Sequence, residues 1–520
     1  MLSGNNYNRA AQFHYIYWHN TPIMQKLISV LLLVYVFSYN SNATVWNVGP
    51  LRTFTLPSQV KTLVQDGDTV YIDGGVYAND ATKWTRNNLW IEGLGTGSNR
   101  TVLQYTGDIP NGKGIFVFET PGSSDNPRIN NIVFDGAQVS DNDGGNGAGI
   151  RFQAANLIVD NCSFINCQNG ILEGNASVTN SSVNITNCEF YNNGYQLPNS
   201  SLSGYEHNIY IGPSTNSLVV INCWFHHPRG QANSLKTRAQ HSYILYNLID
   251  EETDGYGSWE LNIAQGGLNV IMGNVIIQGP AGANHGIVGY DAATNALEDF
   301  YFINNTVINR FVGNVKYFNV APASGINTFK IYNNIFASVT GASITNITGT
   351  IPTVLDTSAN LFSTNYLTLG FTNAMGGDYS LTASATGAID KGVFADSSSD
   401  GMALLPIASY QSFDTGVLSR SVSGSAIDLG AYEYLQPNGI TQFTQQNEIA
   451  VYPNPASDHL FIETGKSYNE IYIFNLTGTL VSHSILPQDG GMDIGTLSSG
   501  VYIAEIKCGD LVVRKKWVKM

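Results

Sequence analysis

The chain has 520 residues, of which 43% are hydrophobic and only 12% are charged, so its solubility must come from Asn, Ser, Thr and Gly. This length accommodates two or three domains and a large core. The net charge of -15 argues against a nucleic-acid partner, because phosphates require a basic binding surface. It does not exclude an anionic polysaccharide, since a local basic patch can lie on an acidic body.

Residues 1–43 predict an N-terminal extension followed by a secretory signal peptide. Met24-Gln-Lys26 supplies a basic start, residues 27–37 form an apolar run, and Ser41-Asn-Ala43 offers small residues before a cleavage site. Residues 1–23 lack such a pattern, so Met24 is the expected true start and cleavage is expected after Ala43. The apolar run is short for a membrane span, and no later segment predicts one.

The next segment is expected to cap a solenoid. Pro57 and the apolar spacing of residues 56–64 predict a short amphipathic helix. A cap is needed because an open solenoid end exposes both its core and its strand edges. The coils are then expected from about residue 68 to about residue 340, and residues 340–435 predict an irregular C-terminal end cap with further strands.

A recurring asparagine predicts the solenoid of β coils. Neighbouring members of the series lie 26, 35, 25, 27, 31 and 29 residues apart, each before a short apolar strand. A period between about 20 and 50 residues indicates stacked units that share one core. Asn at a fixed corner tolerates left-handed backbone geometry and can hydrogen-bond along the stack. The series comprises Asn161, Asn187, Asn222, Asn247, Asn274, Asn305 and Asn334.

The chain contains 5 cysteines, an odd number, so a disulfide framework is not expected. Cys162, Cys188 and Cys223 each follow a periodic Asn directly. Such a column would suit a metal site or a redox relay, but a stack of small buried apolar side chains is the favoured interpretation.

Three consecutive coils contain strands that align without insertion. Residues 207–212, 233–238 and 259–264 start 26 residues apart, and their apolar members mark the inward face. Alternate residues are therefore expected to point outward, within a patch about 10 Å across because stacked strands lie about 4.8 Å apart. The expected outward columns are Asn208, Ser234 and Glu260, and Tyr210, Lys236 and Asn262, with Arg238 beside them.

Neighbouring loops add more charged residues. Glu260 and the acidic residues of one loop would supply hard oxygen ligands, so Ca²⁺ is an option as a cofactor. Their spacing follows no calcium-loop template, so no metal ligand is assigned and Ca²⁺ stays an option only. The loop residues are His226, His227 and Arg229 on one side, and Asp250, Glu251, Glu252 and Asp254 on the other.

A linker and a small domain are predicted at the C-terminus. Residues 436–448 are polar and interrupted by Gly, which is typical of a linker. Residues 449–520 contain short strands separated by turns, and these predict a small β-sandwich.

Both parts of the chain resemble known families. The coils and the closing Asp428-Leu-Gly-Ala-Tyr-Glu-Tyr434 segment resemble the right-handed parallel β-helix superfamily typified by pectate lyases, over about residues 45–435. The C-terminal part resembles the type A sorting domain of the Bacteroidota type IX secretion system. This resemblance rests on Tyr452-Pro-Asn-Pro455, Asn475-Leu-Thr-Gly478, Leu497-Ser-Ser-Gly-Val-Tyr502 and the basic end, Arg514-Lys-Lys-Trp-Val-Lys519.

The second resemblance implies export by the type IX machinery, followed by release or attachment to the outer surface. The first implies an all-β fold in residues 44–435 and a polysaccharide lyase that cleaves an acidic, uronic-acid polymer by β-elimination. Lys236 is the candidate base, because adjacent Arg238 disfavours its protonated form. Arg238 or Arg229 would hold the substrate carboxylate, and Tyr210 would protonate the leaving oxygen. Substrate binding is expected from Asn208, Asn262, Glu260, Arg229 and His227.

Two other functions compete with the lyase. A non-catalytic glycan-binding or adhesin-like protein would use the solenoid as a rigid display surface. A glycoside hydrolase would need two carboxylates, yet Glu260 is the one carboxylate on the aligned strands, so a hydrolase is less favoured. The fold itself does not decide between them. A monomer is expected.

Overall fold

The computed structural model describes residues 43–119, 126–174, 180–194, 204–291, 295, 297–321, 325–435, 450–463, 470–475, 480–484, 491–508 and 511–519. Two compact units result, Met1–Tyr434 and Leu435–Met520. The predicted signal peptide, apart from Ala43, and the predicted linker lie outside the described residues. Within the described ranges, no helix is long and apolar enough to span a bilayer.

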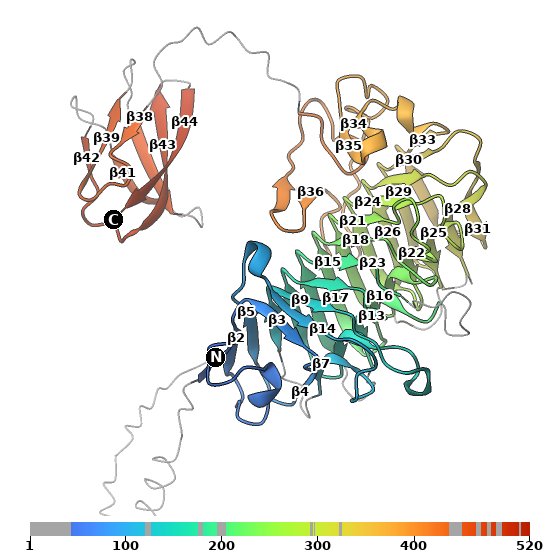
Figure 1. The fold of residues 1–520 in the computed structure, drawn as a ribbon. Coiled ribbons are helices and arrows are strands. Elements are labelled where there is room, and N and C mark those ends of the chain that lie inside the picture. Colours follow the sequence, from blue (N-terminus) through green and yellow to red (C-terminus); the bar gives the residue numbers. More distant parts are fainter. Residues whose placement is uncertain are drawn as a thin grey trace, which may run out of the picture. The chain divides into compact units, whose positions relative to one another are not determined.

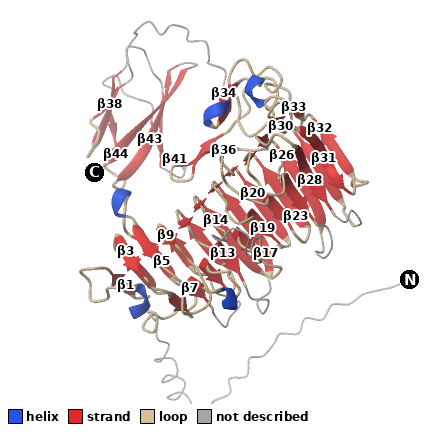
Figure 2. Ribbon diagram, turned by 45° about the vertical axis from the view of Figure 1, so that its right-hand side comes forward, coloured by secondary structure: helices blue, strands red, loops and turns tan. Residues whose placement is uncertain are grey.

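The first unit is a parallel β-helix, as the sequence predicted (Figure 1). Each complete coil contributes one strand to each of three parallel sheets, in the order sheet 1, sheet 2, sheet 3, whereas the first coil contributes a strand only to sheet 1 and the last only to sheets 1 and 2. Figure 2 shows these strands stacked in rows along the solenoid.

Sheet 1 comprises β1 (Val45–Val48), β2 (Thr69–Ile72), β5 (Trp90–Gly93), β8 (Arg128–Asn130), β11 (Leu157–Asp160), β14 (Ser181–Thr186), β17 (Thr215–Ile221), β20 (His241–Leu245), β23 (Gly267–Met272), β26 (Glu298–Ile303), β29 (Thr328–Tyr332) and β32 (Leu355–Ser358). Sheet 2 comprises β3 (Gly75–Ala78), β6 (Thr101–Gln104), β9 (Ile132–Asp135), β12 (Ser163–Ile165), β15 (Glu189–Tyr191), β18 (Trp224–His226), β21 (Leu248–Asp250), β24 (Val275–Gln278), β27 (Thr306–Asn309), β30 (Ile335–Ser338) and β33 (Leu361–Ser363). Sheet 3 comprises β4 (Thr82–Trp84), β7 (Gly114–Phe118), β10 (Ala148–Phe152), β13 (Asn169–Glu173), β16 (His207–Ile211), β19 (Asn233–Thr237), β22 (Trp259–Ile263), β25 (Gly286–Tyr290), β28 (Asn314–Val320) and β31 (Ser343–Gly349). Short 3₁₀ helices are η1 (Pro57–Gln59), η2 (Gly97–Asn99), η3 (Asp141–Asp143), η4 (Tyr366–Thr368) and η5 (Ala374–Gly376).

The core is built from equivalent side chains of successive coils. Phe134, Phe164, Phe190 and Phe225 stack with ring centroids 5.0, 5.0 and 4.7 Å apart. These separations match the spacing of about 4.8 Å between neighbouring strands. In-register pairing of sheet 2 therefore sets the geometry of the aromatic stack.

The periodic asparagines occupy two adjacent columns and not the single column expected from their spacing. Asn161, Asn187 and Asn222 adopt φ angles of 51°, 54° and 55° at the turn between sheets 1 and 2, where Asn is tolerated. Tyr246, with φ of 56°, is their next equivalent. Asn247 instead continues the column of Cys188 and Cys223. The Trp224 N–H donates a hydrogen bond to the Cys188 carbonyl, and one coil later the Leu248 N–H donates to the Cys223 carbonyl in the same way. Asn247, which precedes Leu248, is therefore the equivalent of Cys223.

The second column forms a hydrogen-bonded ladder inside the solenoid. The side-chain oxygen of Asn274 accepts from both the backbone N–H and the side chain of Asn247, each at 2.9 Å. The same pattern links Asn274 to Asn305 and Asn305 to Asn334.

The cysteine column occupies the same inner position in earlier coils. Cys162, Cys188 and Cys223 are fully buried free thiols within the core cluster. This confirms the interpretation of these residues as a stack of small buried side chains.

The predicted N-terminal helix is reduced to the single 3₁₀ turn η1, followed by further turns. A segment of this length gains little from helical hydrogen bonding, since isolated helices shorter than about 12 residues are marginal. Val60 and Val64 are nevertheless buried against the first coils.

Residues 366–434 differ from the end cap predicted by the sequence, because they pack along the side of the solenoid (Figures 1 and 2). Tyr379 and Leu429 bury the outer face of sheet 2, and Leu404 and Ala408 bury that of sheet 1. Strands buried on both faces read as continuous apolar runs, and Val275-Ile-Ile277 is such a run. This segment contains two antiparallel hairpins, β34 (Phe371–Asn373) with β35 (Asp378–Leu381), and β36 (Ala408–Ser412) with β37 (Gly416–Ser419).

The second unit has two small antiparallel sheets, in agreement with the predicted sandwich. They enclose a core that includes Leu460, Ile471, Ile506 and Trp517. One sheet consists of β38 (Ala450–Tyr452), β39 (His459–Glu463) and β42 (Gly491–Asp493), and the other of β40 (Glu470–Asn475), β41 (Leu480–Ser484), β43 (Gly500–Cys508) and β44 (Leu511–Lys519).

The asparagine ladder predicts a specific stability effect. Asn274→Ala should lower the free energy of unfolding by about 1–3 kcal/mol, because it leaves the buried donors of Asn247 without their acceptor. Exposed Asn314 of β28 offers the matched control Asn314→Ala. Urea unfolding of both variants would test this, and equal midpoints would contradict a stabilising role for the ladder.

Candidate functional site

The outer face of sheet 3 carries the column predicted from the aligned strands. Tyr210 of β16 pairs with Lys236 of β19, and Lys236 pairs with Asn262 of β22. All three side chains are half-buried, whereas their neighbours Ile209, Leu235 and Leu261 are fully buried. The predicted register and orientation of this column are confirmed.

Two cations flank the Tyr210 ring. The Lys236 Nζ lies 5.1 Å from the ring centroid, and the Arg238 Cζ lies 5.5 Å from it. Each contact is a cation–π interaction of about 0.5–2 kcal/mol. The ring thereby lies next to two basic groups on one outer face.

The surroundings of Lys236 lower its pKa below the usual value. Burial of the side chain is the largest cause and the positive charge of Arg238 is the second. Asp291 acts in the opposite direction with the smallest effect. The sequence identified the contribution of Arg238, but not the larger contribution of burial.

Arg151 extends this patch and was missed by sequence reasoning. It lies in the same column of sheet 3, where Arg151 pairs with Leu172 and Leu172 with Tyr210. Its guanidinium lies against Gly174, where any Cβ would come within 2.2 Å of Nη2. Loops of unequal length separate these coils. The sequence separation is 21 residues from Arg151 to Leu172 but 38 residues from Leu172 to Tyr210, so the sequence alone does not reveal that these positions are aligned.

Trp259 of β22 and Asp291, which directly follows β25, complete the patch on the next two coils. Burial raises the pKa of Asp291, while Lys236 and Arg238 act to lower it. The Trp259 ring covers Gly286 and Gly289 of β25, where a Cβ would lie 2.3 and 3.4 Å from ring atoms. These glycines leave room for a half-exposed aromatic platform in the coil of Asn262. We refer to Arg151, Tyr210, Lys236, Arg238, Trp259, Asn262 and Asp291 as the sheet 3 patch.

The other predicted outward column is wrong, because Asn208, Ser234 and Glu260 are buried. Their equivalents in earlier coils, Gly149 and Gly170, lie against the core rings of Phe164 and Phe190. The strands of sheet 3 therefore turn two consecutive residues inward at this point. Asn208 accordingly accepts a hydrogen bond from the buried side chain of Asn193. Neither Asn208 nor Glu260 is available to bind a substrate at the surface.

Glu260 belongs to a pair of buried carboxyl groups. Burial and the neighbouring Glu251 raise the pKa of Glu260 well above its ordinary value, and its oxygens have no hydrogen-bond partner among the described residues. Burial also raises the pKa of Glu251 to about 8, although its Oε2 accepts from the Gly279 N–H at 3.0 Å.

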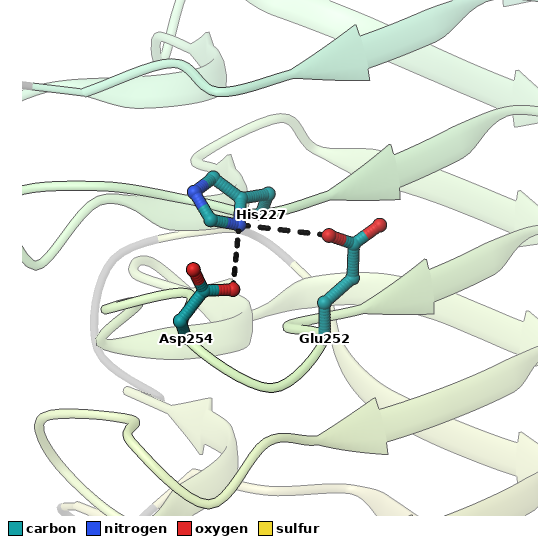
Figure 3. Close-up of side chains that lie close together, drawn as sticks. All are labelled: His227, Glu252 and Asp254. Carbon is teal, nitrogen blue, oxygen red and sulfur yellow. Dashed lines mark ion pairs between the residues drawn. The ribbon is translucent and has the colours of Figure 1, made fainter.

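The loop residues form a second cluster at the turn between sheets 2 and 3. Figure 3 shows His227 between Glu252 and Asp254, with Nδ1–oxygen distances of 3.5 and 3.3 Å. His227 also contacts the ring of Tyr191. Burial lowers the pKa of Arg229, and the groups whose charges act on this pKa are Cys167 and Tyr191. These contacts place the two predicted substrate-binding residues in this cluster and not beside Tyr210.

The acidic residues considered as Ca²⁺ ligands do not gather at one place in the structure. Glu251 and Glu260 are buried, and Asp250 lies 3.7 Å from Arg310 in an ion pair. Only Glu252 and Asp254 of that set lie together with His227 among the described residues.

Comparison with known proteins identifies the C-terminal unit. Residues 450–520 match the family model described as the secretion system C-terminal sorting domain. No curated protein matches the chain. The protein is therefore a parallel β-helix protein with a type IX sorting domain, which directs its secretion and attachment to the outer surface through the type IX machinery.

The lowered pKa of Lys236 predicts its reactivity toward amine reagents. Lys236 should be acylated at lower pH than the exposed Lys61, because burial and Arg238 favour the neutral amine. Arg238→Gln should shift the labelling curve of Lys236 to higher pH, since it removes the second of these causes. Mass spectrometry after pulse acylation would measure both curves, and an unchanged curve in Arg238→Gln would contradict the coupling.

The buried Glu260 predicts a pH-dependent stability effect. Because its folded-state pKa is raised, the folded state holds a proton that the unfolded state loses from about pH 4.5 upward, and stability falls as pH rises through the folded value. Glu260→Gln should therefore gain stability over the wild type increasingly toward alkaline pH. Urea midpoints between acid and alkaline pH would measure this, with half-exposed Glu92→Gln as the control. If the urea midpoints of Glu260→Gln and the wild type changed with pH in parallel, the predicted effect of Glu260 would be refuted.

Proposed function

We propose that the sheet 3 patch is the active site of a polysaccharide lyase acting on a uronic-acid polymer outside the cell. The observation that carries this proposal is the half-buried Lys236, whose pKa is lowered beside Arg238 on the ring of Tyr210. A lowered pKa favours the neutral amine, which is the form of Lys236 that can abstract a proton.

The reaction is a β-elimination. The Lys236 amine takes the proton of the carbon next to the substrate carboxylate, and the electron pair of that C–H bond forms a carbon–carbon double bond. The neighbouring C–O bond breaks, and the leaving oxygen takes a proton from the Tyr210 hydroxyl. The Lys236 ammonium then returns a proton to Tyr210 through solvent, which restores both groups.

The patch suits a negatively charged substrate. Arg151 and Arg238 contribute two guanidinium groups to the sheet 3 patch, and guanidinium groups bind carboxylates in bidentate fashion. A bound carboxylate next to two guanidinium groups acidifies the adjacent C–H bond. Three basic side chains, Arg151, Lys236 and Arg238, thus gather with Asp291 on a protein whose net charge is -15.

Two further side chains fit the sugar rings. The Trp259 platform offers an apolar face for a pyranose ring, and the Asn262 amide can hydrogen-bond to hydroxyl groups. Both lie on the coil that follows Lys236, one strand spacing away.

The buried state of Glu260 weighs against a glycoside hydrolase. Hydrolysis needs two carboxylates on opposite sides of the scissile bond. Asp291 is the carboxylate whose charge acts on Lys236, and Glu260, the predicted second one, is buried.

Loss of activity in patch variants is the main test. Lys236→Gln should reduce cleavage by at least about 100-fold, because proton transfer by a positioned group contributes that much. Arg238→Gln should also reduce cleavage, because it removes a guanidinium group that binds the substrate carboxylate. Ultraviolet absorbance of unsaturated ends, measured against a panel of uronic-acid polymers, detects the reaction. Reducing ends without ultraviolet absorbance would indicate a hydrolase, and unchanged polymer length would indicate a glycan-binding protein.

A matched control comes from another lysine–tyrosine pair. The Lys330 Nζ lies 5.0 Å from the Tyr332 ring on sheet 1, away from the patch. Lys330→Gln should retain full activity. Wild-type turnover in Lys236→Gln would remove the sheet 3 patch as the active site.

A further inference from the structure

We propose that His227, Glu252 and Asp254 form a binding site for a divalent transition-metal ion of the Zn²⁺ class. This inference is independent of the lyase proposal, because its residues lie at the turn between sheets 2 and 3 and not on the sheet 3 patch. One ligand atom from each of the three residues lies within 4.8 Å of the others (Figure 3).

The distances fit a metal site better than direct hydrogen bonds. The His227 Nδ1 lies 3.3 Å from Asp254 Oδ1 and 3.5 Å from Glu252 Oε2, both longer than an N–H···O hydrogen bond of about 2.7–3.2 Å. Ligands bound at about 2.0–2.2 Å to a tetrahedral ion lie about 3.3–3.6 Å apart. Only small side-chain movements would therefore bring the three atoms around one ion.

A second group holds one of the ligands in place. The His226 Nδ1 lies 2.8 Å from the Glu252 Oε1, and the His226 Nε2 lies 3.3 Å from a carboxylate oxygen of Glu189. Glu252 thus uses one oxygen toward His226 and leaves the other, Oε2, for the His227 side. Outer-shell hydrogen bonds of this kind orient the ligands of metal sites.

The solenoid does not itself require a histidine at position 227. Residues 166, 192 and 227 occupy equivalent left-handed turn positions, with φ of 56°, 57° and 49°. The first two are asparagines joined by a side-chain hydrogen bond of 2.6 Å. His227 replaces that pattern with a ring nitrogen directed at two carboxylates.

The donor set selects the class of metal ion. Imidazole nitrogen with carboxylate oxygens suits Zn²⁺ and related ions, whereas Ca²⁺ takes six to eight oxygen ligands. The side chains of His227, Glu252 and Asp254 are 19%, 35% and 76% exposed. Three protein ligands at a partly exposed position leave a coordination position for water or a ligand oxygen.

Metal titration of the full chain, prepared without a polyhistidine tag, tests the proposal. Calorimetry with Zn²⁺ and absorption spectroscopy with Co²⁺ should reveal one site that His227→Asn and Asp254→Asn weaken by more than about tenfold. His227→Asn keeps a residue that tolerates the left-handed turn, and Asp254 is exposed, so both variants should fold. His226→Gln should weaken binding about 10- to 100-fold.

Exposed Asp356 in the last strand of sheet 1 provides the control Asp356→Asn, which should bind Zn²⁺ as the wild type does. Zn²⁺ affinity that is unchanged in both His227→Asn and Asp254→Asn would overturn the proposal. A site that binds Ca²⁺ in preference to Zn²⁺ would overturn the assigned class of metal.

Discussion

In-register hydrogen bonding between successive coils is the constraint on which the rest of the structure depends. Each strand pairs with the equivalent strand of the next coil, so residues one coil apart lie one strand spacing apart, about 4.8 Å. The phenylalanine stack, the asparagine ladder and the Tyr210, Lys236 and Asn262 column all follow from it. A shift of one residue would turn each of these columns to the opposite face.

The same constraint brings like charges together on both faces of sheet 3. Lys236 and Arg238 meet on the outer face of one strand, whereas Glu260 of the next strand is turned inward, close enough to Glu251 for their charges to interact. Burial shifts the pKa of Lys236 and of Glu260 in the same direction as the neighbouring like charge does. The reason is that burial favours the neutral form both of an amine and of a carboxylic acid. Stacked coils can therefore place an amine with a lowered pKa and a carboxyl group with a raised pKa on neighbouring strands.

Whether the sequence alone could reveal which residues share a column depended on whether neighbouring coils have equal length. The column of Lys236 was predictable because neighbouring coils there are both 26 residues long, with no insertion. Arg151 was hidden by unequal loops, and Glu260 by an inward turn of the strand that breaks strict alternation. Asn222 and Asn247 looked equivalent because adjacent turn positions both favour Asn, one for its left-handed backbone and the other for its hydrogen bonds along the stack.

Residues that the solenoid does not need indicate where function lies. The match to the sorting-domain family covers residues 450–520, in the second unit, and includes none of the coils. Core stacking and the ladders are satisfied by apolar residues, Cys and Asn, and an Asn at position 227 would continue the pattern of Asn166 and Asn192. A half-buried Lys236 beside Arg238 and a histidine facing two carboxylates both oppose the local preferences of the fold. Departures of this kind are expected at functional sites, and here they occur twice, within two consecutive coils.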